Sequence, residues 1–244
     1  MDLGSVIWNP WHGCTRYSEG CRHCYVYRRD ESVGRDPATV YRTGDFSLPQ
    51  KKRRDGSHKL SGENGMRVYT CLTSDFFLPA ADPFREEAWQ MMKDRPDLTF
   101  YIITKRAKEA VSRLPADWGE GYANVILAFT VENQRRADER LPLIAAIPAA
   151  RKELCVEPML EAIDFRGKLR ECGIRAVSVG GESGPDARIC DFDWVRSVAR
   201  QCADEGLGFR YHQTGACLRK DGRLYRIPRK LQASQARKAG LDHD

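Results

Sequence analysis

Three cysteines near the start of the chain could hold a metal centre. Cys14, Cys21 and Cys24 are separated by six and then by two residues. A [4Fe–4S] cluster is normally held by four cysteine thiolates. Three thiolates would leave one iron open to a further ligand, and an open iron is a place where chemistry can occur. The spacing therefore predicts an iron–sulfur cluster that takes part in a reaction.

The same residues allow a second interpretation. Three cysteines and one histidine are a normal ligand set for structural zinc, and His12 lies just before Cys14. A closed zinc site would make the segment a structural staple. The remaining cysteines are scattered singly, which is typical of small buried residues in a chain that keeps its thiols reduced. They are Cys71, Cys155, Cys172, Cys190, Cys202 and Cys217.

The bulk composition is that of a globular protein. The chain has 244 residues, of which 41% are hydrophobic and 30% charged, enough for one domain with a large core. It lacks the run of roughly 20 apolar residues that spans a bilayer, and no leader peptide is evident. We expect a cytoplasmic monomer without membrane contact. The net charge of +6 slightly favours a polyanionic partner.

Short apolar segments alternate with segments of helical periodicity along most of the chain. We expect strands over residues 5–8, 67–72, 99–104, 124–130, 152–156, 176–179 and 208–213. We expect helices over residues 84–93, 108–114, 134–146, 165–172 and 194–205. In the last helix, Asp193 is the expected N-cap and Gly206 the expected end. This alternation predicts an α/β fold, an incomplete parallel (β/α) barrel of six to seven strands.

Two polar regions interrupt this pattern. We predict a barrel domain over residues 1–215 that contains a basic insertion loop, 35–65, and a basic tail over residues 216–244. The loop includes the run Lys51-Lys52-Arg53-Arg54, which is either a solvated turn or a DNA contact. In the tail, eight Lys and Arg residues lie between positions 219 and 238, with a single acid. Tyr225 lies between Arg223 and Arg226 in the sequence, and its ring could stack on a nucleic-acid base.

Polar side chains follow six of the expected strands at their carboxyl ends. In parallel α/β folds these ends meet at one rim, where ligands bind. The residues are Ser74-Asp75, Lys105-Arg106, Thr130 with Glu132, Glu157, Glu182-Ser183 and His212-Gln213. A single polar strand end would not indicate a site, because strands commonly end in polar residues. Six such ends beside a cysteine segment predict an active site, although His212 alone could equally be a core histidine.

The motifs resemble a phage-type protein family, Gp37/Gp68, over about residues 5–215. The segments that carry this resemblance are Trp8-Asn9-Pro10, Gly13-Cys14, Ser18 to Tyr25, Thr104-Lys105-Arg106, Thr130 to Asn133, Glu157-Pro158 and Gly180 to Pro185. The parts also resemble spore photoproduct lyase, a radical S-adenosylmethionine enzyme that repairs a thymine dimer in DNA. Two features depart from that pattern: the first cysteine gap is usually three residues, and the Gly-Gly-Glu run usually follows strand two.

The likeness to spore photoproduct lyase implies a [4Fe–4S] cluster on the three cysteines and S-adenosylmethionine on the open iron. A flavodoxin-type or ferredoxin-type reductant would supply one electron. The cofactor would then yield a 5′-deoxyadenosyl radical that takes a hydrogen atom from the substrate. The residues implied to hold the cofactor are His23, Tyr25, Ser74, Asp75, Lys105, Thr130 and Glu132. Tyr25 and Cys71 would be catalytic, with Cys71 returning the hydrogen atom; a buried strand cysteine is the other interpretation of Cys71.

The implied substrate is DNA that carries a pyrimidine photolesion, bound through its phosphates with the lesion flipped out of the stack. The expected substrate contacts are Arg106, Glu157, Glu182, Ser183, Arg188, His212, Gln213, Arg223, Tyr225 and Arg226. Two other functions remain open at this stage. One is a zinc-stapled nucleic-acid-binding protein without catalysis, and the other is a radical enzyme that modifies a nucleobase or a metabolite.

Overall fold

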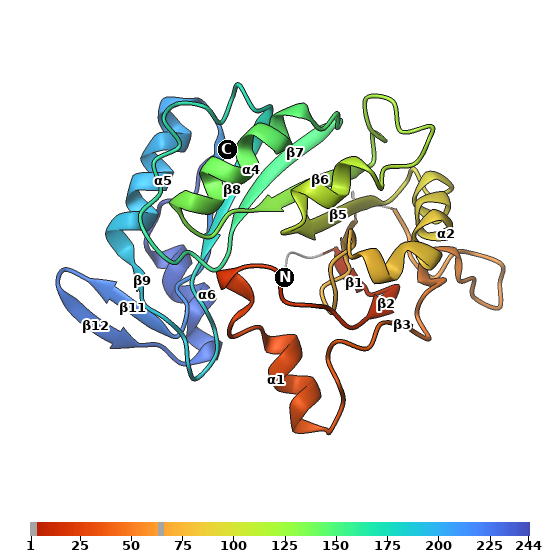
Figure 1. The fold of residues 1–244 in the computed structure, drawn as a ribbon, viewed down its shortest axis with the longest axis horizontal. Coiled ribbons are helices and arrows are strands. Elements are labelled where there is room, and N and C mark those ends of the chain that lie inside the picture. The colour runs from red at the N-terminus through yellow and green to blue at the C-terminus, as the bar shows by residue number, and fades with distance from the viewer. Residues whose placement is uncertain (1–3, 63–65) are drawn as a thin grey trace. The chain divides into compact units, whose positions relative to one another are not determined.

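The computed structural model describes residues 4–62 and 66–244. Its main element is a seven-stranded, all-parallel sheet that curls into a half-barrel and is interleaved with helices (Figure 1). The strands, in the order in which they neighbour one another, are β1 (Ser5–Trp8), β4 (Arg67–Thr70), β5 (Thr99–Thr104), β6 (Val125–Thr130), β7 (Arg151–Val156), β8 (Ile174–Gly180) and β10 (Gly208–Gln213). The predicted incomplete parallel barrel is confirmed.

Helices and short strands connect and extend this sheet. The helices are α1 (Tyr25–Ser32), α2 (Asp82–Lys93), α3 (Ala107–Val111), α4 (Gln134–Ala146), α5 (Phe192–Asp204) and α6 (Arg229–Lys238), with 3-10 turns at Glu19–Cys21, Leu48–Gln50 and Pro79–Ala81. The short strands are β2 (Trp11–His12), β3 (Tyr41–Arg42), β9 (Cys190–Asp191), β11 (Cys217–Lys220) and β12 (Arg223–Arg226). Among the helices of the described residues, none has both the length and the apolar character needed to cross a membrane.

Two details of the helix predictions were wrong. Residues 165–172 form turns and not a helix, because Arg166 (φ 56°) and Gly167 (φ 66°) both adopt the left-handed conformation, which a right-handed helix cannot contain. The N-cap of α5 is Asp191 and not Asp193: the Asp191 side chain accepts a hydrogen bond from the Asp193 amide at 2.9 Å. Gly206, at φ 64°, follows the end of α5 as expected.

The contacts divide the chain into two compact units. The first contains Met1–Arg16, Val26–Ala128 and Ile147–Arg151, and the second contains Tyr17–Tyr25, Phe129–Ala146 and Lys152–Asp244. Most of the predicted insertion loop is folded within the first unit, with Phe46, Leu48 and Leu60 buried; its residues 63–65 lie outside the described residues. The basic tail forms β11, β12 and α6 of the second unit, and Figure 1 shows β11 and β12 as a hairpin.

In the second unit, alternation along β7, β8 and β10 gives the sheet two different faces. One face is apolar and buried, with Val156, Val179 and Tyr211 among its side chains, and α5 packs against β8 and β10. The opposite face carries polar groups, including Ser178 and His212. The sheet thus presents polar side chains on one face and core side chains on the other.

Candidate functional site

The first half of the cysteine segment is held by backbone contacts within the first unit. Gly13 adopts a φ of 94°, and a Cβ at this position would lie 2.0 Å from the carbonyl oxygen of Thr39. The amide of Cys14 donates to the carbonyl of Pro37 at 2.8 Å, and the amide of Gly13 donates to the carbonyl of Thr73 at 3.2 Å. Only glycine fits before Cys14, and the backbone position of Cys14 is thereby set.

A buried arginine from the end of β5 supports the residue after Cys14. Arg106 is 5% exposed. Its Nη2 donates to the carbonyl oxygen of Thr15 at 2.8 Å and to the Thr15 hydroxyl at 2.9 Å. Arg106 was predicted to contact substrate, but its observed contact is with the cysteine segment. It therefore joins the carboxyl end of a barrel strand to the chain beside Cys14.

The Ser74-Asp75 pair links two strand ends to the same segment. The Ser74 hydroxyl donates to the carbonyl oxygen of Gly13. The Asp75 carboxylate accepts from the Thr104 hydroxyl at 2.8 Å and from the Lys105 amide at 3.1 Å. The loop after β4 is thereby tied to the end of β5 and to the residue before Cys14. The predicted cofactor residues of this unit lie around one short stretch of chain.

Cys71 follows β4 and combines two unusual properties. It is 1% exposed, and its φ of 66° is left-handed, which is uncommon for a residue other than glycine and is often found at functional sites. Burial raises the pKa of the Cys71 thiol well above its usual value, and the nearby charges of Asp75 and Cys14 raise it further. A hydrogen bond with Ser74 lowers this pKa, but by less than the other effects raise it. The thiol therefore keeps its proton at neutral pH.

In the second unit, a buried carboxylate holds the residues that precede Cys21. Glu132, just after β6, is fully buried. One carboxylate oxygen accepts from the Ser18 hydroxyl and from the amide of Gly20 at 3.3 Å. The other oxygen accepts from Nη1 of Arg140 at 2.8 Å, and the same nitrogen donates to the carbonyl of Thr130 at 2.6 Å. A buried charge needs such partners, and here they include the cysteine segment.

Two further arginines hold Glu19, which lies between Cys14 and Cys21. Arg136 in α4 forms a two-pronged ion pair with the Glu19 carboxylate, at 2.8 and 3.1 Å. This hydrogen bonding lowers the pKa of Glu19 to about 2. Nη2 of Arg188 donates to the carbonyl oxygen of Glu19 at 2.9 Å, and Nε of Arg188 donates to the Glu182 carboxylate at 3.0 Å. Glu182 and Arg188 thus support the segment as a pair.

A third group of predicted residues lies on the polar face of the second unit. Nδ1 of His212 lies 2.7 Å from the Glu157 carboxylate, whose other oxygen accepts from the Ser178 hydroxyl at 3.0 Å. Burial alone would raise the pKa of Glu157, but the His212 charge and these hydrogen bonds lower it overall. The Glu157 charge in turn raises the pKa of His212. The half-exposed imidazole is an oriented, readily protonated group, and not a core histidine.

His12 has other partners than a metal. Its Nε2 lies 2.6 Å from the Asp30 carboxylate, and its Nδ1 lies 3.4 Å from Nη2 of Arg29. Both ring nitrogens are therefore in use. No group of three or more His, Cys, Asp or Glu residues within 4–62 and 66–244 is arranged to hold a metal ion.

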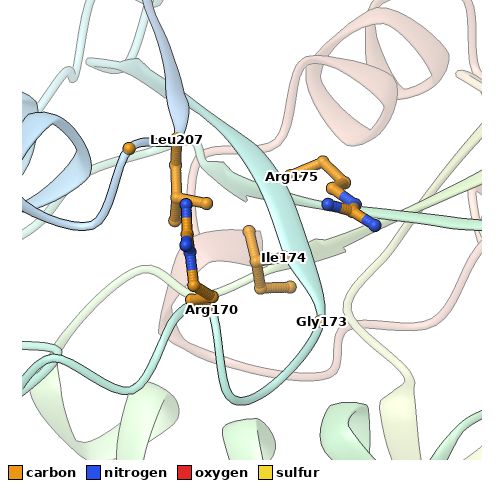
Figure 2. Close-up of a pocket in the computed structure, with 6 residues that line it drawn as sticks. Arg170, Gly173, Ile174, Arg175 and Leu207 are labelled. Atoms are coloured by element: carbon orange, nitrogen blue, oxygen red, sulfur yellow. The ribbon is translucent and has the colours of Figure 1, made fainter.

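A pocket of about 310 Å³ lies in the second unit, at the starts of β8 and β10 (Figure 2). Its lining residues are Arg170, Gly173, Ile174, Arg175, Gly206 and Leu207. Ligands of parallel α/β folds bind at the opposite, carboxyl ends of the strands. We therefore leave this pocket outside the candidate site.

Comparison with known families finds one match, which covers nearly the whole chain. A model of a protein family of unknown function, DUF5131, matches residues 3–242. The chain belongs to the DUF5131 family. Searches of curated proteins and of solved structures find no match. The match places nearly the whole chain in one family but gives it no function, and the likenesses to the Gp37/Gp68 family and to spore photoproduct lyase stay predictions.

The DUF5131 chain brings most of the predicted residues into three groups and leaves others apart. Gln213 donates to the carbonyl of Gly181 at 3.2 Å, and Ser183 accepts from Arg229 at 3.2 Å. The residues of β12, which include Arg223, Tyr225 and Arg226, are all exposed on the hairpin.

Sequence reasoning missed four supporting residues of the DUF5131 chain: Thr15, Glu19, Arg136 and Arg140. The i, i+4 spacing of Arg136 and Arg140 on a helix after Glu132 is the one local signal that could have found part of this group, because it places both guanidiniums on one helix face.

The protonation of Cys71 predicts a selective labelling pattern. In metal-free protein at pH 8, iodoacetamide should modify Cys14, Cys21 and Cys24, which are partly exposed, and leave Cys71 unmodified, because the thiolate is the reactive form. Mass spectrometry of the peptides measures this. Labelling in guanidinium chloride, where every thiol should react, is the control. Equal labelling of Cys71 and Cys14 in the folded protein would show that Cys71 is neither buried nor protonated.

The Glu157–His212 pair predicts a pH response that NMR can follow. Replacing Glu157→Gln should lower the pKa of His212, because the neighbouring charge that raises it is lost. Through His212, the pair stabilises the fold at low pH, and this contribution disappears as the pH rises through the raised pKa. The lowered pKa of Glu157 also stabilises the fold, at pH values above the usual pKa of a glutamate. This contribution is lost as the pH falls through the lowered pKa of Glu157.

The measurement is the pH titration of the His212 imidazole protons. Ser178→Ala is the matched control. It removes a donor to the other carboxylate oxygen and keeps the charge, so it should shift the pKa of His212 less than Glu157→Gln does. An unchanged titration in Glu157→Gln would contradict the pairing.

Proposed function

We propose that this DUF5131 chain is a radical S-adenosylmethionine enzyme whose [4Fe–4S] cluster is held by Cys14, Cys21 and Cys24. The observation that carries the proposal is the way the cysteine segment is supported. Arg106, from the end of β5, holds the residue after Cys14, and Glu132, from the end of β6, holds the residues before Cys21. The segment is thus built onto the strand ends where barrel enzymes bind ligands.

The chemistry of the donors favours an iron–sulfur cluster over a structural zinc site, and the three cysteines of the described chain would have to come together to bind it. The three thiols are partly exposed and belong to a segment whose backbone is held by fixed contacts. Soft thiolates suit iron–sulfur clusters. A zinc staple would need a fourth ligand, and the expected one, His12, is hydrogen bonded to Asp30.

Several residues are available for the cofactor itself. The Thr130 hydroxyl is fully buried and has no hydrogen-bond partner among the described residues, so it is suited to a bound ligand. We assign cofactor contacts to Thr130, His23, Tyr25 and Lys105. The polar groups of Ser74, Asp75 and Glu132 are already occupied by the protein, and we assign them the role of positioning the cysteine segment.

Bound at these residues, the cluster and S-adenosylmethionine would supply the chemistry of hydrogen-atom abstraction. The chain itself supplies a protonated thiol at Cys71, held beside the Ser74 and Asp75 loop. An S–H group is the form that would give a hydrogen atom to a product radical. The thiyl radical left on Cys71 would then take up one electron from the reductant and one proton from solvent, which restores the thiol. The electron would come from a flavodoxin-type or ferredoxin-type partner.

The substrate we propose is DNA with a pyrimidine photolesion. The β11–β12 hairpin supports the nucleic-acid part, because Arg223 and Arg226 flank an exposed Tyr225 on its outer strand. Cations bind phosphates and an exposed aromatic ring can stack on a base. The choice of lesion follows from the likeness to spore photoproduct lyase.

The test begins with protein purified and reconstituted without oxygen. We expect brown protein with about four irons per chain, which bleaches with dithionite and converts S-adenosylmethionine to 5′-deoxyadenosine. Cys14→Ala, Cys21→Ala and Cys24→Ala should each abolish that conversion. Cys202→Ala, at a buried cysteine of α5, is the matched control and should retain it.

Two other results would change the assignment. Colourless protein with one zinc after reconstitution would overturn the enzyme and leave a zinc-stapled binding protein. Formation of 5′-deoxyadenosine without affinity for ultraviolet-irradiated DNA would remove the DNA substrate and favour modification of a nucleobase or metabolite.

A further inference from the structure

A short basic hairpin stands out in the first unit. We call residues 51–59 the basic arm. An antiparallel bridge joins Lys52 to His58, and the amide of Arg53 donates to the carbonyl of Ser57 at 2.8 Å. At its base, the amide of Lys59 donates to the carbonyl of Lys51 at 2.7 Å. These bonds close the arm into a defined turn (orange, near α2 in Figure 1).

One buried guanidinium anchors both stems of the basic arm. Arg95, just after α2, is 4% exposed. Its Nη1 donates to the carbonyl oxygen of Pro49 on one side of the arm, and its Nη2 donates to that of Leu60 on the other at 2.7 Å. The Asp97 carboxylate balances the charge of Arg95. Both ends of the basic arm are therefore held in place by Arg95, whereas the ends of a solvated loop would have no such anchor.

The basic arm presents cations that the protein does not neutralise. Lys52, Arg54 and Lys59 are exposed, and their side chains have no ion-pair partner within residues 4–62 and 66–244. The acid of the arm, Asp55, is directed back to the turn, where its carboxylate accepts from the amide and hydroxyl of Ser57 at 2.9 and 2.6 Å. The outcome is an ordered turn with three outward positive charges.

We propose that the basic arm is a second nucleic-acid contact of this protein, which binds backbone phosphates through Lys52, Arg54 and Lys59. Fixed points at both stems reduce the ordering cost of binding, because the cations are held on a structured turn before the ligand arrives. Residues 52–58 contain no aliphatic side chain and no Phe, Tyr or Trp, so the tip lacks the groups that insert into a lipid surface. Phosphate contacts of this kind give affinity without sequence preference.

This inference rests on the proposed function only in taking a nucleic acid as the substrate. It does not depend on the cluster or on the radical reaction. The two can therefore fail separately, and the experiment measures DNA binding on its own.

The test is fluorescence anisotropy with a labelled DNA duplex and its single strand, over a range of salt concentrations. The arm variant carries Lys52→Gln, Arg54→Gln and Lys59→Gln. We expect it to bind about 10–100-fold more weakly at low salt, and the slope of log K against log salt to become shallower by about 2–3, because each phosphate contact contributes about 0.9 to that slope. Circular dichroism checks that the variant is folded.

A matched control variant removes the same charge elsewhere. Lys168, Arg175 and Arg200 are exposed cations of the second unit, and their replacement by glutamine should leave the salt slope unchanged. Equal losses in both variants would reduce the effect to net charge and overturn the proposal. An arm variant that binds like the wild type would overturn it too.

Two further measurements separate the remaining outcomes. Wild-type protein that binds vesicles containing phosphatidylserine but no DNA would assign the basic arm to a membrane surface and overturn the proposal. Formation of 5′-deoxyadenosine by the arm variant should equal that of the wild type. If neither protein forms it, the radical reaction fails while the DNA-binding result stands.

Discussion

Replacing Glu132→Ala is expected to lower the free energy of unfolding by about 3–5 kcal/mol. Glu132 is fully buried, and its carboxylate is the counter-charge of Arg140, which is itself 4% exposed. Removing one partner leaves the other charge buried and uncompensated. The Ser18 hydroxyl and the Gly20 amide lose their acceptor in the same step. Urea denaturation followed by circular dichroism measures the change.

The control for Glu132 is Glu139→Ala in α4. Glu139 also accepts hydrogen bonds from arginines, Arg135 and Arg136, but it is exposed, and surface ion pairs contribute about 1 kcal/mol or less. The contrast between the two variants separates burial from charge. A similar loss of unfolding free energy in both variants would show that the Glu132–Arg140 ion pair is not shielded from water.

Glu132→Ala should also affect the proposed iron–sulfur cluster. The variant removes the support of the residues just before Cys21 while it leaves all three cysteines in place. We expect less iron to be retained after reconstitution than in the wild type. This readout distinguishes a positioning role from a purely structural one in the core.

Replacing Gly13→Ala is expected to destabilise the protein by about 2–5 kcal/mol and to displace Cys14. The added Cβ would lie 2.0 Å from the Thr39 carbonyl oxygen, and the φ of 94° strains any residue that has a Cβ. The backbone can relieve this contact only by moving the residue before Cys14. Denaturation measures the stability, and iron content after reconstitution measures the displacement.

Gly56→Ala is the matched control for Gly13. Gly56 has a similar positive φ of 83°, but a Cβ there would meet nothing within 4 Å. It should cost about 1 kcal/mol, the strain of the φ angle alone, and leave iron content unchanged. Equal effects of the two substitutions would show that the contact with Thr39 is relieved without cost.

The sequence by itself determined the class of fold and most of its elements. Residues 99–104, 208–213 and 134–146 were predicted with the bounds that β5, β10 and α4 have in the structure. These elements depend on apolar periodicity and on nearby end signals, which are local properties of the chain. The close spacing of Cys14, Cys21 and Cys24 is likewise read from the sequence alone, and their role as cluster ligands stays a prediction.

Local sequence was insufficient where two successive residues take a left-handed conformation. Residues 165–172 have a helix-compatible pattern, but Arg166 and Gly167 form a turn instead. The insertion was predicted as a long loop because its own sequence does not reveal the distant contacts that hold it in place. Its order comes from Arg95, which lies outside the insertion and donates to the carbonyls of Pro49 and Leu60.

Only the tertiary structure decided which side chains support the cysteine segment. Arg106 bonds to a residue 91 positions away, Glu132 to one 114 positions away, and Arg188 to one 169 positions away. Arg106 and Glu132 were placed in the candidate site because each follows a strand, and Arg188 as a substrate contact, but their partners could not be named. Polar groups pair with whatever donor or acceptor the packed strands bring near, because an unpaired buried group is costly. The periodicity of a sequence specifies the strands, and the packing of those strands selects the partners.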